Sequence, residues 1–273
     1  MVLESLITPK NAERNPKEVF FYGILAASIA IILSLWIFRE QSSLVMVFLT
    51  VITCVPLMYM TIKYEEEKDL RIEKERTLIK EHGKALKAFI ALFLGFIVAY
   101  SLWFIFLPSE TTSTLFNIQV STINQINTNI SGNAIRSGIF FSILANNFKV
   151  LLFCIIFAFF YGAGAIFILT WNASVIGTAI GAFVRNQISG IGSYFALYPI
   201  AIMRYMTHGT FEILAYFIAG LGGGIISVAV INHQIGTKRF GRVVVDSMSL
   251  IILSLIVLVI AALVEVYITP LFF

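Results

Sequence analysis

The sequence predicts an all-α protein, a polytopic integral membrane helical bundle of six full spans plus a broken or re-entrant element. Of its 273 residues, 59% are hydrophobic and only 12% are charged, and the mean hydropathy is +0.91. Soluble domains contain about 45–50% apolar and about 25% charged residues, so lipid must be the solvent for this fold. Uncharged apolar runs also recur at the length of about 20 residues that crosses a hydrocarbon core of roughly 30 Å.

Five apolar runs are long enough to cross the membrane as single helices. They are Val19–Phe38, Ser43–Ile62, Ala88–Leu107, Val150–Thr170 and Ser247–Leu271. A sixth run, Phe211–Ile231, contains an acidic residue near its start and several glycines in its middle. Two further apolar pieces, Ala173–Val184 and Tyr194–Met203, are each too short to cross alone. They predict a broken or re-entrant element at 172–205, which is stable only where neighbouring protein satisfies its backbone.

Basic residues predict the orientation, because loops on the cytoplasmic side carry an excess of Lys and Arg. Three basic residues precede the first span and eight more lie within 63–87, whereas 108–147 contains only Arg136. We therefore predict a multi-pass protein of the cell (plasma) membrane with a cytoplasmic amino terminus. The side of the carboxyl end depends on whether the 172–205 element crosses fully.

The chain divides into three regions on this basis. Residues 1–107 form an N-terminal three-span region with a charged segment, 63–87, that is dense in strong helix formers. We expect this segment to be a helical connector lying across the headgroups, with docking of a cytoplasmic partner as the alternative. Residues 108–147 form an extracytoplasmic polar loop and an amphipathic turn, with a sequon at Asn129 whose use depends on the source lineage. Residues 148–273 form a C-terminal membrane core.

A succession of polar and small residues in the second half of the chain goes beyond generic hydrophobicity. Asn146-Asn147 opens a span containing Gly162 and Gly164, Asn172 and Gly177 follow, and then come His208-Gly209, Glu212 and the run Gly220, Gly222, Gly223 and Gly224. In its order and spacing, over roughly Ile143–Val230, this succession resembles the stage II sporulation protein M family. The opening stretch Glu4–Arg14 also looks like the archaeal, non-sporulating branch.

The resemblance implies a multi-span membrane protein without catalytic activity of its own. In spore formers the family member anchors peptidoglycan-degrading partners at the septum during engulfment. In the archaeal branch that wall chemistry has no substrate, so only the scaffold role would carry over. The resemblance therefore implies membrane or peripheral protein partners in addition to the lipid bilayer.

Small residues at G-x-x-x-G spacing predict close helix packing, because helices in lipid associate through packing and not through exclusion of water. The pairs are Gly177 with Gly181 and Gly220 with Gly224. Packing within the monomer is the preferred interpretation, and contact within a homo-oligomer is the alternative.

Polar residues within the C-terminal core are the candidate site, because ionisable groups inside a membrane are costly and mark functional positions. The cluster comprises Asn146, Asn147, Asn172, Arg204, His208, Gly209 and Glu212. Arg204, His208 and Glu212 are spaced four apart, so they share a face if they lie on one helix. We expect Glu212 to face the bundle interior and to accept hydrogen bonds from His208, Arg204, Asn172 or the backbone amides of a half-helix.

These patterns favour a non-enzymatic membrane scaffold or anchor for partner proteins. The alternative is a transporter or channel that uses the 172–205 element and Glu212. The chain has only three histidines and no H-E-x-x-H motif, so a metal site and intramembrane hydrolase chemistry are disfavoured. The sequence also contains no phosphate-binding loop and no soluble nucleotide domain. We therefore predict no catalytic residue, no metal, no cofactor and no nucleic-acid partner.

Overall fold

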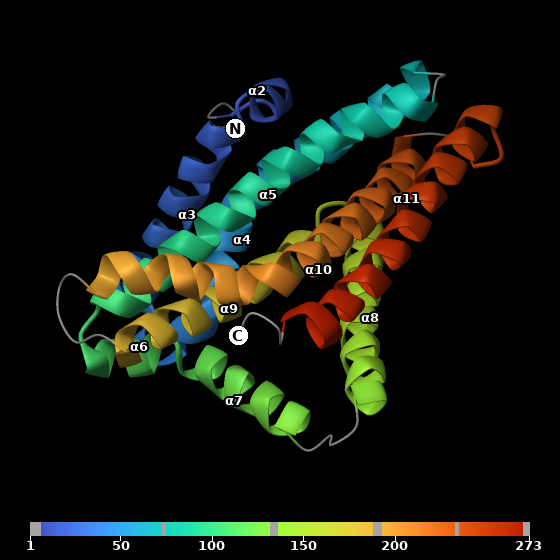
Figure 1. Cartoon of the computed structure of the whole chain (residues 1–273). Coiled ribbons are helices and arrows are strands. Elements are labelled where there is room, and N and C mark those ends of the chain that lie inside the picture. Colours follow the sequence, from blue (N-terminus) through green and yellow to red (C-terminus); the bar gives the residue numbers. More distant parts are fainter. Residues whose placement is uncertain (1–6, 73–74, 132–135, 188–192, 233–234, 270–273) are drawn as a thin grey trace.

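The computed structural model describes residues 7–72, 75–131, 136–187, 193–232 and 235–269. This part of the chain is almost entirely helical and contains no strand, which confirms the predicted all-α class (Figure 1). The order is α2 (Pro9–Arg14), α3 (Pro16–Ile37), η1 (Arg39–Gln41), α4 (Ser42–Arg71), α5 (Glu75–Phe106), α6 (Ser109–Leu115), α7 (Asn117–Ser131), α8 (Arg136–Tyr161), α9 (Ala165–Gln187), α10 (Ser193–Asn232), α11 (Lys238–Leu263) and the π-helical turn η2 (Val264–Ile268).

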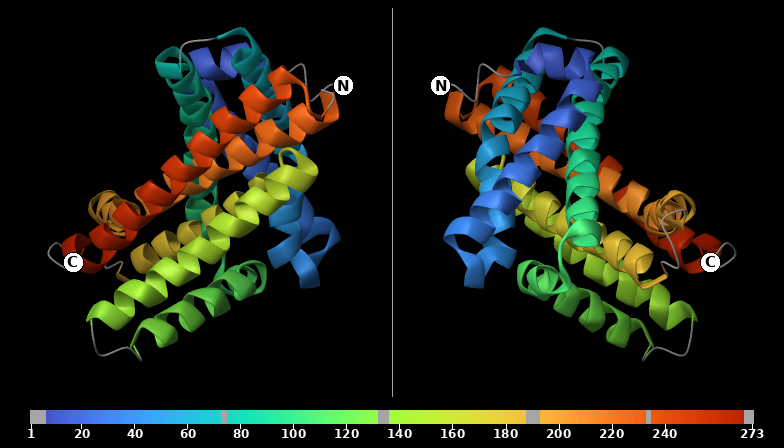
Figure 2. Two further views of the ribbon diagram at one scale, coloured as in Figure 1. Left: turned by 90° about the vertical axis from the view of Figure 1, so that its right-hand side faces the viewer. Right: turned by 90° about the vertical axis from the view of Figure 1, so that its left-hand side faces the viewer.

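Seven segments of the described chain are long and apolar enough to cross a membrane. They are Pro16–Ile37, Arg39–Arg71, Thr77–Phe106, Gly138–Tyr161, Ala165–Gln187, Gly209–Asn232 and Lys238–Ile268. Successive segments run in opposite directions, so the two ends of the described chain lie at opposite ends of the bundle (Figure 2). The protein is therefore a polytopic α-helical membrane protein.

Helix α10 occupies the centre of the bundle. It packs against α4, α5, α8, α9 and α11. In its membrane segment, 83% of an apolar 18-residue stretch is buried, against 22% of the corresponding stretch of α8 and 33% of that of α11. The peripheral helices instead carry exposed large side chains such as Trp36 and Phe160, which suit contact with lipid. A polar group on the inner face of α10 therefore lies inside protein.

The main interruption of the membrane helices lies earlier than the sequence predicted. The run Val150–Thr170, expected as one span, is divided between α8 and α9 at Gly162, whose φ of 65° favours glycine. The expected broken element at 172–205 does not form one unit. Ala173–Val184 is the second half of the uninterrupted helix α9, and Tyr194–Met203 belongs to α10, which continues through Pro199.

Two polar residues within the expected broken element have hydrogen-bond partners, one in α9 itself and one on neighbouring helices. The Asn172 side chain donates to the carbonyl of Ile168 at 2.8 Å, one turn back in the same helix. Arg185 lies near the end of α9 and donates to the Phe104 carbonyl at 3.0 Å and to Thr112 Oγ1 at 2.9 Å. The polar side chains are thus satisfied without a break in the backbone.

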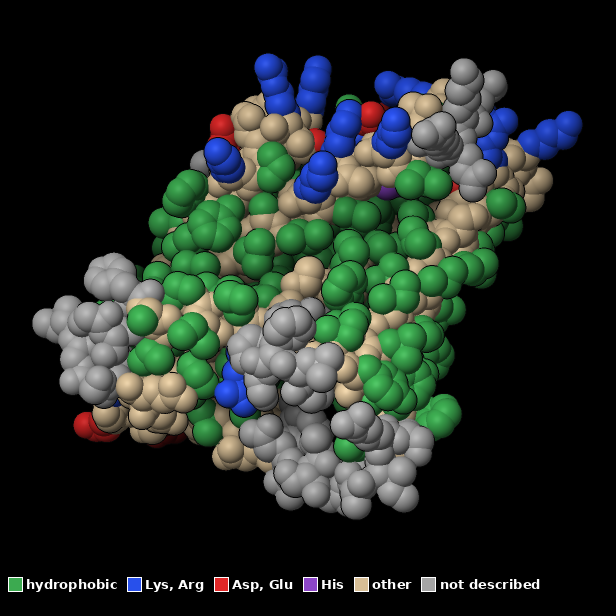
Figure 3. Space-filling view, viewed as in Figure 1, with side chains coloured by type: hydrophobic (Ala, Val, Ile, Leu, Met, Phe, Trp, Pro, Cys, Tyr) green, Lys and Arg blue, Asp and Glu red, His purple; other side chains and the backbone are tan. Residues whose placement is uncertain are grey.

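The charged segment 63–87 also differs from its expected form. It does not form one connector helix on the headgroups. Instead it comprises the end of α4, which stops at Arg71, and the start of α5, which begins at Glu75. On the face shown in Figure 3, Lys and Arg gather at this end of the molecule, above a broad hydrophobic zone. We call this the basic end. It is formed by α2 and the adjoining ends of α4, α5, α10 and α11. The opposite end, which carries α6 and α7, is called the distal end.

Candidate functional site

A cavity of about 290 Å³ gathers most of the predicted polar cluster between α8, α9, α10 and η2. Asn146, Asn147, Asn172, Gly209 and Glu212 all line it. Four further polar residues that sequence reasoning did not single out also line the cavity, namely Ser142, Tyr205, Tyr216 and Glu265. The structure therefore brings together side chains from four elements that are far apart in the sequence.

Glu212 has a different hydrogen-bond partner from those expected. The side-chain amide of Asn147, which is buried, donates to the Glu212 carboxylate across the α8–α10 interface. Glu265, on the π-helical turn η2, lines the same cavity as Glu212. Glu212 is half-buried and lines a cavity between helices, but its hydrogen-bond partner Asn147 comes from another helix and was not among the candidates named for it.

Arg204, also a member of the predicted cluster, does not line the cavity. Arg204 is exposed, and its guanidinium lies 5.5 Å from the centre of the Phe183 ring, a cation–π arrangement. His208 belongs to α10, but its side chain lies outside the described residues. Within the described chain, no group of three or more His, Cys, Asp or Glu side chains is arranged to hold a metal ion.

The predicted packing glycines make their close contacts within one chain. A Cβ atom at Gly177 would lie 2.8 Å from Tyr100 Cβ, and one at Gly181 would lie 2.7 Å from Phe104 Cβ, both on α5. A Cβ atom at Gly220 would lie 2.8 Å from Ala165 Cβ, and one at Gly224 would lie 2.8 Å from the carbonyl oxygen of Gly162. These four glycines therefore allow α9 and α10 to approach neighbouring helices of the same molecule.

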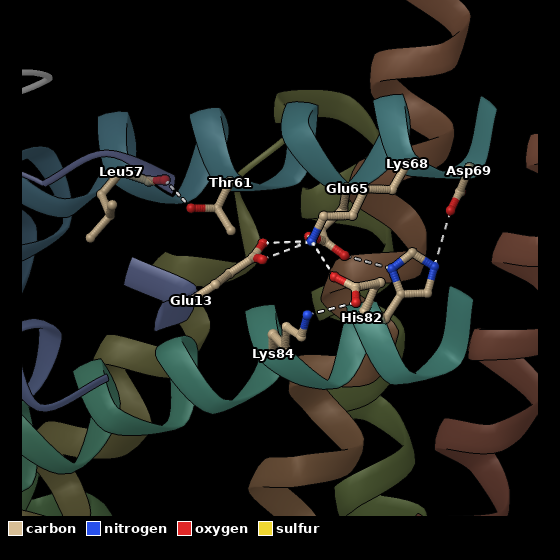
Figure 4. Close-up of polar contacts among 9 residues, drawn as sticks. Glu13, Leu57, Thr61, Glu65, Lys68, Asp69, His82 and Lys84 are labelled. Atoms are coloured by element: carbon tan, nitrogen blue, oxygen red, sulfur yellow. Dashed lines mark hydrogen bonds and ion pairs between the residues drawn. The ribbon is translucent and has the colours of Figure 1, made fainter. Parts of the chain in front are cut away.

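A second polar constellation, at the basic end, was not predicted from the sequence. Lys68 on α4 donates to Glu13 on α2 at 2.8 Å and to Glu65 on its own helix at 2.6 Å (Figure 4). His82 on α5 places Nδ1 2.7 Å from Glu65 Oε2 and Nε2 3.0 Å from Asp69 Oδ1. The second of these contacts is an ion-pair distance without hydrogen-bond alignment, because both atoms lack a hydrogen-bond partner.

We call these five residues, Glu13, Glu65, Lys68, Asp69 and His82, the ionic cluster. Its Glu65 and Asp69 side chains are fully buried and His82 is almost so. Removing one partner from such a buried network leaves an uncompensated charge and costs about 3–5 kcal/mol, so the cluster fixes the geometry of α2, α4 and α5. Burial, assisted by the hydrogen bond with Glu65, raises the pKa of the Glu13 carboxyl group to about 7, against the opposing effect of Lys68.

Helical spacing could have revealed part of this cluster. Glu65 and Asp69 are four residues apart and therefore share a face of α4, which His82 of α5 meets from the other side. The ion pairs Glu67–Arg71 and Glu81–Lys84, at 3.3 Å and 2.6 Å, also have helical spacing but are more exposed than the cluster. Only the pairing of α4 with α5 distinguishes the buried charges from the exposed ones.

The fold and the cavity define a class of protein, a polytopic helical membrane protein with a polar cavity inside its C-terminal helices. Residues 85–270, more than half of the chain, match the family described as stage II sporulation protein M. The chain belongs to that family, as its sequence motifs indicated.

Comparison with known proteins adds one relative and no structure. The chain is 30% identical over 135 residues to an uncharacterized protein of Methanocaldococcus jannaschii, an alignment that covers 47% of this chain and 70% of the relative. This archaeal similarity agrees with the resemblance to the archaeal branch. No solved structure matches the chain.

Proposed function

We propose that this protein is a non-enzymatic membrane scaffold whose basic end holds partner proteins at the cytoplasmic face of the plasma membrane. The observation that carries the proposal is the ionic cluster, which joins α2, α4 and α5 where they extend beyond their apolar runs. A scaffold needs a surface whose shape persists without its partner, because ordering a surface on binding costs affinity. The buried ion pairs supply that preorganisation at one end of the molecule.

The basic end also offers an apolar contact beside its charges. Ile79 on α5 is 50% exposed and precedes Ala88, where the uncharged apolar run of its helix begins. It borders a cavity of about 210 Å³ that is lined by His82 and by Asp246, Ser249, Leu250 and Leu253 of α11. An exposed aliphatic side chain next to a concave surface offers an apolar contact to a partner protein.

Site-specific photo-crosslinking in native membranes tests the scaffold. A photoreactive residue at Ile79 should give one reproducible protein adduct, whereas the same residue at Phe160, which is 70% exposed on the apolar surface of α8, should react only with lipid. The yield of the adduct at Ile79 should fall in a Leu253→Glu variant, because this substitution places a charge in the adjoining cavity. Identical lipid adducts at both positions would argue against a docking surface at the basic end.

Transport is the second candidate function, and the cavity around Glu212 favours it, because polar cavities between membrane helices are typical of ion and substrate sites. The continuity of α9 and α10 weighs against a mechanism based on a broken element at 172–205. Stabilisation of the purified protein by a solute, combined with the absence of any protein adduct at the basic end, would favour transport over the scaffold.

A further inference from the structure

The cavity around Glu212 has a mixed lining. Its polar side chains include Glu212, Glu265, Asn147 and Tyr216. Its aliphatic side chains are Ile143, Val150, Val175 and Ile176. Its volume of about 290 Å³ is close to the roughly 300 Å³ at which small-molecule sites begin, and such sites combine apolar walls with a few placed polar groups.

Tyr216 offers a hydroxyl group to a ligand in the cavity. The residue is only 3% exposed and lines the cavity, and its hydroxyl group has no hydrogen-bond partner among the described residues. Polar groups of side chains as enclosed as this one normally have a hydrogen-bond partner. A hydrogen-bonding group inside the cavity would satisfy it.

The two carboxyl groups indicate the charge of that ligand. Glu212 and Glu265 both line the cavity, from α10 and η2, and two carboxylates that share one site repel each other. Described side chains of the cavity wall include no Lys or Arg that could compensate a second negative charge. A cation that donates hydrogen bonds to both carboxylates would remove their mutual repulsion.

We propose that this cavity binds the protonated primary amine of a small alkylamine. The ammonium group donates to Glu212 and Glu265, its third hydrogen bond reaches the Tyr216 hydroxyl oxygen, and the alkyl part packs on Val150, Val175 and Ile176. The amine belongs either to a soluble molecule or to an aminolipid headgroup. This site is independent of the scaffold proposal, which rests on the opposite, basic end of the molecule.

Two other cations fit the cavity less well. A bare metal ion would leave most of the volume empty and the aliphatic side chains without contact, and the described residues provide no group of three or more acidic, His or Cys ligands. A quaternary ammonium ion has no hydrogen to donate and is recognised by a cage of aromatic faces. This cavity instead offers hydrogen-bond acceptors and only two tyrosines.

Thermal unfolding of the full-length purified protein tests the proposal. Cys54 and Cys154 are both buried, so a thiol-reactive dye reports their exposure on unfolding. We would titrate butylamine hydrochloride, tetramethylammonium chloride and magnesium chloride at fixed pH and ionic strength. Butylamine should raise the unfolding temperature saturably, by about 5 °C at a hundredfold excess over its dissociation constant, with little effect of the other two salts.

Variants distinguish the site from general amine effects. Glu212→Gln and Glu265→Gln should each weaken the apparent affinity for butylamine at least tenfold, and Tyr216→Phe should weaken it about threefold to tenfold, as for the loss of one hydrogen bond. Glu110→Gln is the matched control, because its side chain is 88% exposed at the distal end, and it should respond as the unchanged protein does. The two Gln variants keep an acceptor for Asn147, and Tyr216→Phe provides a further test that leaves both carboxyl groups in place.

Each outcome of the titration decides the matter. If soluble butylamine has no effect, the same unfolding measurements are made in nanodiscs whose lipids carry either ethanolamine or choline headgroups. Stabilisation by the ethanolamine lipid alone, lost in Glu212→Gln, would identify a lipid source of the amine and support the proposal. Equal stabilisation by butylamine in the Gln variants, a stronger response to magnesium or tetramethylammonium, or no response to any amine source would overturn it.

Discussion

The close crossing of α3 and α5 allows a sharp prediction from a single methyl group. A Cβ atom at Gly95 on α5 would collide with the carbonyl oxygen of Phe20 and would lie 3.1 Å from the amide nitrogen of Ile24 and 3.2 Å from the Cα of Gly23. All three neighbours are backbone atoms of α3, so no side-chain rotation can make room. The two helices must separate if Gly95 is replaced by alanine.

The size of the effect follows from two opposing contributions. Inserting a methyl group into a packed interface costs about 1–3 kcal/mol, whereas alanine in place of glycine favours a helix by about 0.5–1 kcal/mol. Gly83 provides the matched control on the same helix, because a Cβ atom there would meet nothing within 4 Å. Gly95→Ala should therefore be less stable than Gly83→Ala by about 1–3 kcal/mol, which corresponds to roughly 2–12 °C in unfolding temperature for a chain of this size.

The thiol-dye melt gives the comparison directly, because both cysteines are buried in helices that neither substitution touches. The two variants and the unchanged protein should be measured in one detergent and at one heating rate, since unfolding of membrane proteins is commonly irreversible. Equal unfolding temperatures for Gly95→Ala and Gly83→Ala would refute the reasoning, because they would mean that α3 and α5 do not cross at this point.

Three further predictions concern other parts of the molecule. Gly224→Leu should lower the unfolding temperature without changing the oligomer size in chromatography, because a Cβ atom there would already lie 2.8 Å from the Gly162 carbonyl oxygen and 3.0 Å from Ile62; a change of oligomer size with unchanged melting would place this face in an interface between chains. The raised pKa of Glu13, about 7 against an ordinary 4.5, means that the folded protein holds this proton more tightly than the unfolded chain, so its contribution to stability is full below about pH 4.5 and is lost as the pH rises to about 7. Hydrogen exchange of the α2 amides, corrected for intrinsic rates, should then be faster at pH 8 than at pH 5.5, and Glu13→Gln should abolish that difference. For topology, an impermeant thiol reagent applied to intact cells should label Ser113→Cys at the distal end, and should label Lys84→Cys at the basic end only after permeabilisation; the reverse pattern would invert the orientation that the basic residues predict.

Several features of the protein were determined by the sequence alone. Composition and the length of the apolar runs established the membrane class and the first three spans. The thickness of the bilayer fixes the minimum length of a spanning helix, and that length can be recognised in a single sequence. The order of the asparagines, His208-Gly209, Glu212 and the glycines indicated the family. Four of the packing glycines and the inward position of Glu212 also followed from general rules, since small residues permit close helix contact and a carboxyl group avoids lipid.

Other features depended on the tertiary structure. An apolar run does not reveal where a helix turns back, so the division between α8 and α9 at Gly162 required the backbone geometry. Glu265 becomes part of the cavity only because α11 returns beside α10 and α8, and Gly95 becomes a crossing point only because Gly23 faces it. The sequence places Glu65 among many surface charges, but the packing of α2 and α5 against α4 buries it with Lys68 and His82. Periodicity determines which face of a helix a residue occupies, whereas the partner of that face is decided by contacts between segments far apart in the chain.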